Sequence, residues 1–499
     1  MSTVIIGAGP VGIFFTKMLL DKGFNVTLIE SGSIKSESNL LKRDRYVFET
    51  ESALPPEVHR IGGGSTKWRG RLSEFLDNDF HKVSEIGDKI WPFDKNELVK
   101  HYSKVYEFLG VGNLTDEQIV SKFFLNETNS LPNNLYLRSF RYCKPDFFVN
   151  LFEGYKTNPN LRLFTEHLCT EIQADSIDNQ FSLHLISSNE EKKTIYADKV
   201  VITCGTLQTT ALLQRSKQLL QQNCQNVLGV GLMEHAEGYV GNIVVADKNE
   251  KEFFTKICND VKNRALDVMD GIGVAISLEN KDDDSSTQIN TQFEIRNFMP
   301  RPYYLSKVAK DINNAILLKT INIFLFTEKA FSYALRNLRK LLDYIFRKKR
   351  FSIYLKAEEI SFNESTVKIS TDSPLVVTYN HQISEETCQL IVRSLQKFSK
   401  IFERTFQAKM TLYSETNSMN KIIKIFGANW HPMGTTRLGI DPNRSVCNEQ
   451  LQVHGVPNLF LLSASVFPSG SNTNPTFTAL ALANRLSESV YFNESTVNQ

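Results

Sequence analysis

The chain has 499 residues, of which 41% are hydrophobic and 22% are charged, and its formal net charge is +2. A chain of this length and apolar content can bury a large core, divided among two or more structural units. The near-neutral charge points to no particular partner, and no nucleic-acid-binding motif accompanies it.

The cysteines argue against a disulfide or metal framework. There are seven, scattered along the chain without a Cys-x-x-Cys pair. An odd number of separated cysteines is typical of reduced thiols, so we expect a cytoplasmic protein with no bound metal.

The N-terminus predicts a dinucleotide-binding turn. A short β-branched run, residues 3–6, is followed by Gly7, Gly9 and Gly12 and then by a helical pattern over residues 11–22. Glycines allow the tight turn and let a pyrophosphate approach the backbone, while the helix N-terminus attracts its charge. A glycine-rich turn without a ligand is the alternative.

An acidic residue stands where a dinucleotide site needs one. Glu30 ends the next predicted strand, residues 25–30, in the place of a ribose-binding carboxylate. Its charge disfavours a 2′-phosphate. The pattern leaves both NAD and FAD open.

A second glycine cluster, residues 60–70, contains Gly63, Gly64 and Ser65. Its backbone freedom suits close approach to a flat cofactor, and a merely flexible loop is the alternative.

The middle of the chain predicts a second sheet. Residues 99–109 form an amphipathic helical pattern, and residues 161–203 read as strands that rejoin the first unit. From about 237 to 383 alternating strands predict an antiparallel sheet, followed by a helix over 385–404. We expect His235 to be structural, and three aromatic residues are candidates to face a ligand: Phe293, Tyr303 and Phe326.

Residues 301–350 form a basic segment, with twelve Lys/Arg against three Asp/Glu. Apolar residues share one helical stripe here and basic residues lie largely elsewhere, which is the layout of a basic amphipathic helix. A core-packed helix with a solvated face is the first interpretation. Weak contact with a membrane surface or an acidic partner is the alternative.

The C-terminal region holds the candidate chemistry. His431 opens a loop rich in Gly, Pro and Thr, and Asn474 precedes a predicted buried helix that begins near Pro475. A near-neutral imidazole can accept a hydroxyl proton while an amide at a helix N-terminus steadies the charge. On spacing alone, a structural histidine and a capping asparagine explain the pattern as well.

A resemblance to a known family favours the catalytic interpretation. His431-Pro-Met-Gly-Thr-Thr-Arg, Val453-His-Gly-Val-Pro-Asn-Leu-Phe, Ala464-Ser-Val-Phe-Pro and Asn474-Pro-Thr are similar, in this order, to the C-terminal signature of glucose-methanol-choline (GMC) flavoprotein oxidoreductases. The resemblance extends over most of the chain and implies FAD. It also implies that His431 and Asn474 are the catalytic pair facing the flavin.

The resemblance also implies further cofactor contacts. The segment with Gly63, Gly64 and Ser65 packs on the cofactor in that family, and Pro475 and Thr476 belong to its C-terminal motif. Two departures matter, and both concern FAD. Lys67 replaces a histidine that binds FAD covalently in pyranose oxidase relatives, so we expect non-covalent FAD. Ser463 replaces a common Asp, which weakens one polar contact with FAD.

Together these observations predict an α/β fold, with a Rossmann-like FAD-binding domain (1–80, 160–235 and 425–499) and a substrate domain on an antiparallel sheet (81–159 and 236–424). The motif style resembles bacterial sugar and glycoside dehydrogenases, which implies oxidation of a carbohydrate or other alcohol hydroxyl. Oxygen and another redox partner both remain open as electron acceptor. A lyase that binds FAD and a non-catalytic binding platform are the rival functions.

Overall fold

The computed structural model describes residues 2–41, 46–48, 58–82, 90–112, 114–174, 180–258, 272–278, 289–297, 348–373, 375–417, 422–426 and 430–489. Most of the basic segment 301–350 is outside these ranges, and so are Tyr303 and Phe326. The predicted basic helix therefore lies outside the described residues.

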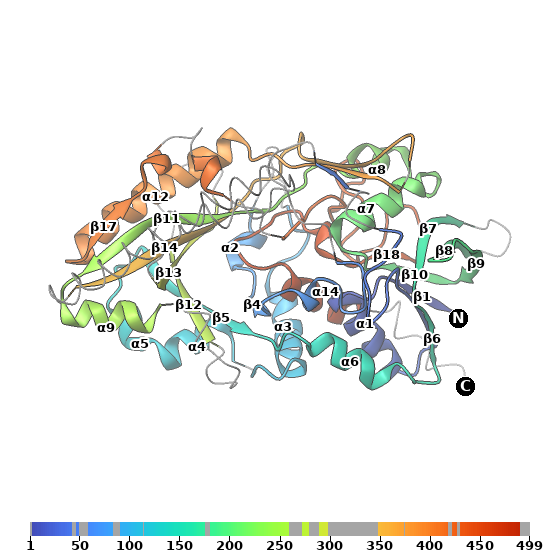
Figure 1. Cartoon of the computed structure of the whole chain (residues 1–499), viewed down its shortest axis with the longest axis horizontal. Coiled ribbons are helices and arrows are strands. Elements are labelled where there is room, and N and C mark those ends of the chain that lie inside the picture. Colours follow the sequence, from blue (N-terminus) through green and yellow to red (C-terminus); the bar gives the residue numbers. More distant parts are fainter. Residues whose placement is uncertain are drawn as a thin grey trace, which may run out of the picture.

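A five-stranded parallel sheet forms the centre of one lobe (Figure 1). Its strands, in spatial order, are β18 (Leu459–Leu461), β10 (Lys199–Ile202), β1 (Thr3–Ile6), β2 (Val26–Ile29) and β6 (Leu161–Phe164). The first three strands are buried along their whole length, as expected for a parallel sheet that is covered on both faces. This sheet brings the N-terminal, middle and C-terminal parts of the chain together.

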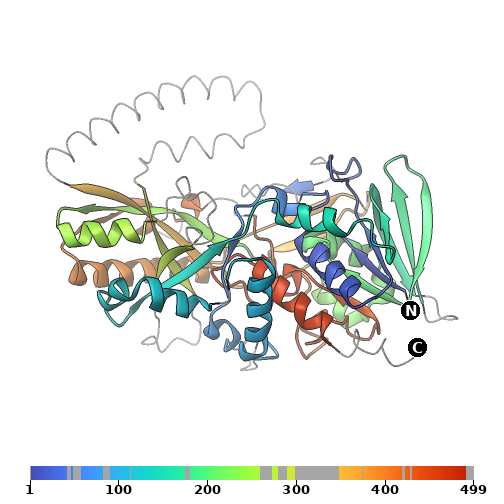
Figure 2. The same cartoon turned by 90° about the horizontal axis from the view of Figure 1, so that it is seen from below.

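Helices from distant parts of the sequence pack beside this sheet. They are α1 (Pro10–Asp21), α3 (Asn96–Phe108), α6 (Phe147–Tyr155), α7 (Gly205–Arg215) and α14 (Thr476–Ser487). Helix α14 packs against both α1 and α3, and the three lie side by side in Figure 2. Nearly all of its residues are buried, which agrees with the predicted buried helix.

A seven-stranded sheet organises the other lobe (Figure 1). All its described pairings are antiparallel, and its order is β17 (Lys409–Leu412), β11 (His235–Val245), β14 (Lys349–Glu358), β13 (Thr291–Asn297), β12 (Ile272–Leu278), β5 (Leu135–Tyr142) and β4 (Arg71–Leu72). Its apolar face packs against α12 (Glu385–Thr405) and α9 (Lys248–Lys256). The predicted antiparallel sheet and the helix after it are therefore confirmed.

One aromatic candidate was wrong. Phe293 lies on the apolar face of this sheet, fully buried, and its ring stacks on Phe398 of α12 with centroids 3.7 Å apart. Side chains alternate between the two faces of a strand, so its neighbours Gln292 and Glu294 occupy the other face. Phe293 belongs to the core.

Two three-stranded sheets complete the fold. One is antiparallel and contains β7 (His167–Ala174), β8 (Phe181–Ser187) and β9 (Lys192–Ala197). The other contains β15 (Thr366–Ile369), β16 (Val377–Asn380) and β3 (Tyr46–Phe48). The remaining described α-helices are α2 (Asp77–Phe80), α4 (Asp116–Phe123), α5 (Leu125–Asn129) and α8 (Gln222–Val227).

The predicted fold class, a parallel-sheet unit joined to a unit on an antiparallel sheet, is confirmed. The domain boundaries remain a prediction. Strand β4 lies in the antiparallel sheet although it falls within 1–80, and α6 packs on α1 although it falls within 81–159. Among the described residues, no helix combines the length and apolarity that crossing a membrane would require.

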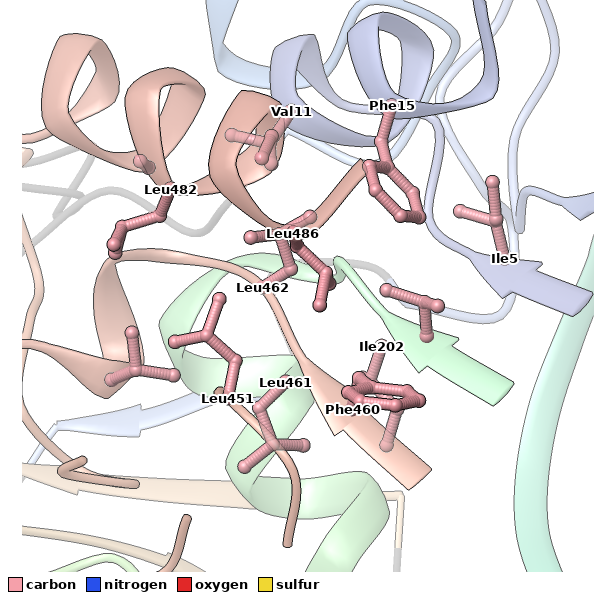
Figure 3. Packing of buried hydrophobic residues seen from close by; sticks show 14 of the residues in the cluster. Ile5, Val11, Phe15, Ile202, Leu451, Phe460, Leu461, Leu462, Leu482 and Leu486 are labelled. Atoms are coloured by element: carbon pink, nitrogen blue, oxygen red, sulfur yellow. The ribbon is translucent and has the colours of Figure 1, made fainter. Parts of the chain in front are cut away.

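The contact between α14 and the parallel sheet provides a stability test. Leu482 of α14 is fully buried, and Figure 3 shows it in the cluster that includes Val11, Leu451 and Leu462. We expect Leu482→Ala to lower the free energy of unfolding by about 2–5 kcal/mol, because it removes buried methyl groups and leaves a cavity. Denaturant-induced unfolding of the cofactor-free protein measures this change.

Leu125→Ala is the matched control, since Leu125 is 53% exposed. We expect it to change the unfolding free energy by less than about 0.5 kcal/mol. Equal effects of the two substitutions would contradict the described packing of α14.

Candidate active site

The glycine turn after β1 is built as the sequence predicts. Gly7 has φ +102°, and Gly9 is the N-cap of α1, with Pro10 at its first position. A Cβ on Gly12 would lie 2.0 Å from the Gly7 carbonyl oxygen and 2.6 Å from Thr203 Oγ1, so only glycine allows α1 to approach the turn this closely. A Cβ on Gly9 would meet nothing within 4 Å, because Gly9 borders a cavity.

Glu30 follows β2 and borders the same cavity. Its carboxylate accepts hydrogen bonds from the backbone N–H groups of Ala8 (2.8 Å) and Gly32 (2.9 Å). Burial raises the pKa of Glu30, and these backbone donors partly offset the rise. A carboxylate has about four lone-pair sites, so Glu30 holds the turn and can still accept from a ligand hydroxyl.

The second glycine cluster packs against the first. Gly63 has φ +49°, and a Cβ there would lie 2.9 Å from the Gly9 Cα. Gly63 and Gly64 border the cavity, whereas Ser65 is buried outside its lining, with its hydroxyl donating to the Gly62 carbonyl (2.6 Å). The Ser65 side chain therefore supports the turn.

Lys67 forms an ion pair at the protein surface. Its ammonium pairs with Glu37 at 2.6 Å, and both side chains are about half exposed. Lys67 is absent from the cavity lining. The position that resembles a covalent attachment site thus presents an exposed ion pair.

The histidine loop is constrained by close backbone packing. Met433 forms an isolated antiparallel bridge with Met233, and a Cβ on Gly434 would lie 2.5 Å from Met233 Cε and 2.8 Å from the Gly231 carbonyl oxygen. Trp430 has φ +64°, in the left-handed region that a residue of this size rarely adopts. His431 lies between Trp430 and these closely packed residues, so its position is fixed.

The side chains of His431 and Asn474 contact each other. Asn474 Nδ2 lies 2.7 Å from His431 Nε2, and α14 begins two residues after the asparagine. The backbone N–H of His431 also donates to both carboxylate oxygens of Glu234, at 2.9 and 3.0 Å. Burial raises the pKa of Glu234 well above its ordinary value.

A second histidine determines the proton positions. His235 Nε2 lies 3.2 Å from the Gly470 carbonyl oxygen, which can only accept, so this nitrogen carries the proton. In the neutral ring, His235 Nδ1 is then an acceptor. It lies 3.2 Å from His431 Nδ1, which must donate. His431 Nε2 is consequently left with a lone pair, directed at Asn474.

The charges around His431 keep its ring neutral. Burial first, and then the positive charge of Lys356, hold the pKa of His431 well below its usual value. Lys356 pairs with Glu237 at 3.0 Å, and this pairing holds the pKa of Glu237 well below its ordinary value despite burial. At neutral pH the site therefore presents an unprotonated imidazole nitrogen.

His235, Glu237 and His431 also have side-chain atoms close enough together to suit a metal ion. The Lys356 ammonium already occupies one oxygen of Glu237, and a second cation there would be repelled. Glu237 Oε2 accepts a hydrogen bond from the Tyr354 hydroxyl at 3.0 Å, and Oε1 is paired with the Lys356 ammonium.

One cavity connects the glycine turns with the histidine loop. Its lining runs from Gly7, Gly9 and Glu30 through Gly63 and Gly64 to His431, and it also includes Ser463, Pro475 and Thr476. Ser463 caps the short 3-10 turn Ala464–Val466, with its Oγ accepting from Ser465 N at 3.2 Å. The cavity thus provides a buried carboxylate and glycine-lined backbone at one end and a neutral imidazole at the other. This lining fits an extended dinucleotide.

Three residues of this site were not predicted from the sequence. They are His235, as a contact of His431, and both members of the Glu237–Lys356 pair. We expected His235 to be structural, yet its ring contacts His431. Glu237 and Lys356 face each other across β11 and β14. The available signal was a run of polar residues at every second position of the buried strand β14: Ser352, Tyr354, Lys356 and Glu358.

Comparisons with known proteins find similarity both in sequence and in fold. Residues 361–483 match the family model described as GMC oxidoreductase. The chain is 42% identical over 84 residues to 2-methyl-1,2-propanediol dehydrogenase of Mycolicibacterium austroafricanum, covering 17% of this chain and 15% of that protein. It is 48% identical over 60 residues to C-glycoside 3-oxidase of Arthrobacter globiformis, covering 12% of each. The alignments thus span well under two thirds of these relatives.

Solved structures share the fold over nearly the whole chain. Pyridoxine 4-oxidase from Mesorbium loti superposes with a TM-score of 0.60 at 14% identity, covering 98% of this chain and 99% of that one. Aspergillus oryzae formate oxidase superposes with a TM-score of 0.57, also at 14% identity, covering 97% of each chain. The chain therefore matches the GMC oxidoreductase family model over residues 361–483 and shares its overall fold with these solved structures.

Proposed function

We propose that this protein binds FAD non-covalently and oxidises an alcohol, with a sugar or glycoside hydroxyl as the favoured substrate. The observation that carries the proposal is the 2.7 Å contact between Asn474 and the unprotonated Nε2 of His431. The name of a relative, C-glycoside 3-oxidase, supports the carbohydrate class. We infer a cytoplasmic location from the seven free cysteines. Oxygen or a redox partner would accept the electrons.

The cavity residues suit FAD. The backbone around Gly7 and Gly9, at the N-terminus of α1, would hold the pyrophosphate, and Glu30 would accept from the ribose hydroxyls. Gly63 and Gly64 would lie against the cofactor without side chains in the way. When bound, FAD supplies the acceptor for the hydride that leaves the alcohol carbon.

His431 and Asn474 would act on the substrate oxygen. The lone pair on His431 Nε2 accepts the hydroxyl proton, while the Asn474 N–H group donates to the same oxygen as negative charge develops there. The carbon-bound hydrogen then departs with its electron pair and the carbonyl forms. His235 keeps the proton of His431 on Nδ1, so the opposite nitrogen carries the lone pair that would act as the base.

We expect FAD to copurify and to be released by acid, because Lys67 provides no histidine for covalent attachment. Gly12→Ala should abolish flavin binding, since its Cβ would collide with the Gly7 carbonyl. The visible flavin spectrum before and after acid precipitation measures how much flavin is bound and how much of it is released. Gly154→Ala is the control, because a Cβ there meets nothing within 4 Å. Flavin that stays with the precipitate would contradict non-covalent binding.

We expect His431→Ala to slow flavin reduction by about 10²-fold or more, the usual scale for one acid–base group. Asn474→Ala should have a smaller effect, because an amide positions the oxygen but accepts no proton at neutral pH. Anaerobic single-turnover reduction at matched FAD content measures both, with a substrate found by screening sugars, glycosides and simple alcohols.

In this assay, product without flavin bleaching would indicate a lyase. A protein that cannot be reconstituted with flavin would indicate a binding platform. If His431→Ala reduces its flavin as fast as the wild type, His431 is a structural loop residue.

The lowered pKa of His431 predicts the acid limb of the rate profile. Because its pKa is lowered, the His431 imidazole stays unprotonated at pH values below 6.5, the ordinary pKa of histidine. The rate of flavin reduction should therefore stay nearly constant as the pH falls from 7 to 6. A loss of rate centred on 6.5 would show that the imidazole titrates as it does in water.

A further inference from the structure

Lys356 is a buried cation at the centre of this site. It lies on β14, its side chain is 2% exposed, and its ammonium contacts two oxygens: Glu237 Oε1 at 3.0 Å and Asn474 Oδ1 at 2.9 Å. Burying an ammonium is costly unless it is paired and hydrogen-bonded. The Glu237 carboxylate compensates the positive charge of Lys356. The Asn474 amide, in turn, contacts His431.

The contact with Lys356 determines which end of the Asn474 amide faces His431. An ammonium has only donors, so the amide oxygen must point to Lys356 and the NH₂ group to His431 Nε2. With the amide reversed, its oxygen would face the lone pair of that nitrogen and its NH₂ group would face the ammonium. Both contacts would then be repulsive.

We propose that Lys356 is a positioning residue for alcohol oxidation: its ammonium fixes the Asn474 amide so that Nδ2 faces the substrate oxygen, and strengthens that donor. The inference rests on the proposed function of His431 and Asn474. Withdrawal of electron density from the amide oxygen makes the N–H group a better donor to a developing alkoxide. The same positive charge keeps His431 neutral.

The electrostatic surroundings limit when Lys356 is charged. Burial lowers its pKa to about 8, against the opposing effect of Glu237. The charged or titratable groups that act on this cluster come from four neighbouring segments: Glu237 and His235 of β11, Arg71 of β4, Glu294 of β13, and His431. Lys356 is therefore cationic at neutral pH and loses its proton as the pH rises through about 8.

The test is single-turnover flavin reduction in the FAD-loaded protein. We expect Lys356→Met to slow reduction roughly 10- to 100-fold, the scale of one hydrogen bond to a charged group. Lys356→Arg should recover part of the rate. Lys349→Met is the matched control, because Lys349 is an exposed lysine of the same strand that bonds to Thr255. It should leave the rate unchanged.

A double-mutant cycle separates positioning from general structural damage. If Lys356 acts through the amide, Lys356→Met should have little further effect once Asn474→Ala is present. Equal effects of Lys356→Met in both backgrounds would overturn the inference. The double variant Lys356→Met/Glu237→Gln removes both charges of the ion pair. If this double variant is still slow, the loss of rate is not due to an unpaired buried carboxylate.

The pH profile gives a second readout that a structural role would not move. The wild-type rate should fall as the pH rises through about 8, and Lys356→Arg, which stays charged, should lack this fall. Identical alkaline limbs would overturn the inference. A wild-type rate in Lys356→Met alongside a slow His431→Ala would also overturn it and leave the proposed function intact. A wild-type rate in His431→Ala would overturn both.

Discussion

The hydrogen bond from His235 to the Gly470 carbonyl is the constraint on which the site depends. A carbonyl accepts only, so it fixes the proton on His235 Nε2. The proton positions of His431 Nδ1 and Nε2 follow from this one, and Lys356 orients the amide of Asn474 to match them. The result is an imidazole nitrogen that is unprotonated and oriented in advance, and a preorganised group of this kind would need little rearrangement in the proposed reaction.

The network joins two separately built sheets. The antiparallel sheet supplies His235, Glu237 and Lys356 from adjacent strands, while His431 and Asn474 come from loops attached to the parallel-sheet lobe. Strands fix side-chain positions more rigidly than loops, so the seven-stranded sheet holds the polar side chains in register. The constrained backbone at Gly434 then brings the histidine to them.

Local patterns in the sequence were enough to predict the glycine turn and the acidic residue beside it. Gly7, Gly9 and Glu30 lie within one strand–turn–helix–strand unit, and the structure places them around one cavity as expected. The loop with His431 and the helix after Asn474 also followed from local signals, namely Pro and Gly positions and a run of small apolar residues.

The part of the network around His431 depends on strand register, which single-sequence patterns leave undetermined. Glu237 and Lys356 are 119 residues apart in the chain and meet only because β11 pairs with β14 in one register. A shift of one residue would place Lys356 on the apolar face. The same ambiguity makes Phe293 a candidate ligand-facing residue in the sequence, although it stacks on Phe398 in the core.

The central claim is that one substrate oxygen is held between His431 and Asn474. The most direct test is a crystal structure of the FAD-loaded protein with a bound alcohol or unreactive analogue. The hydroxyl oxygen should lie within hydrogen-bonding distance, about 2.6–3.2 Å, of both His431 Nε2 and Asn474 Nδ2. A bound substrate whose hydroxyl contacts neither atom, with another group in reach of its proton, would contradict the claim.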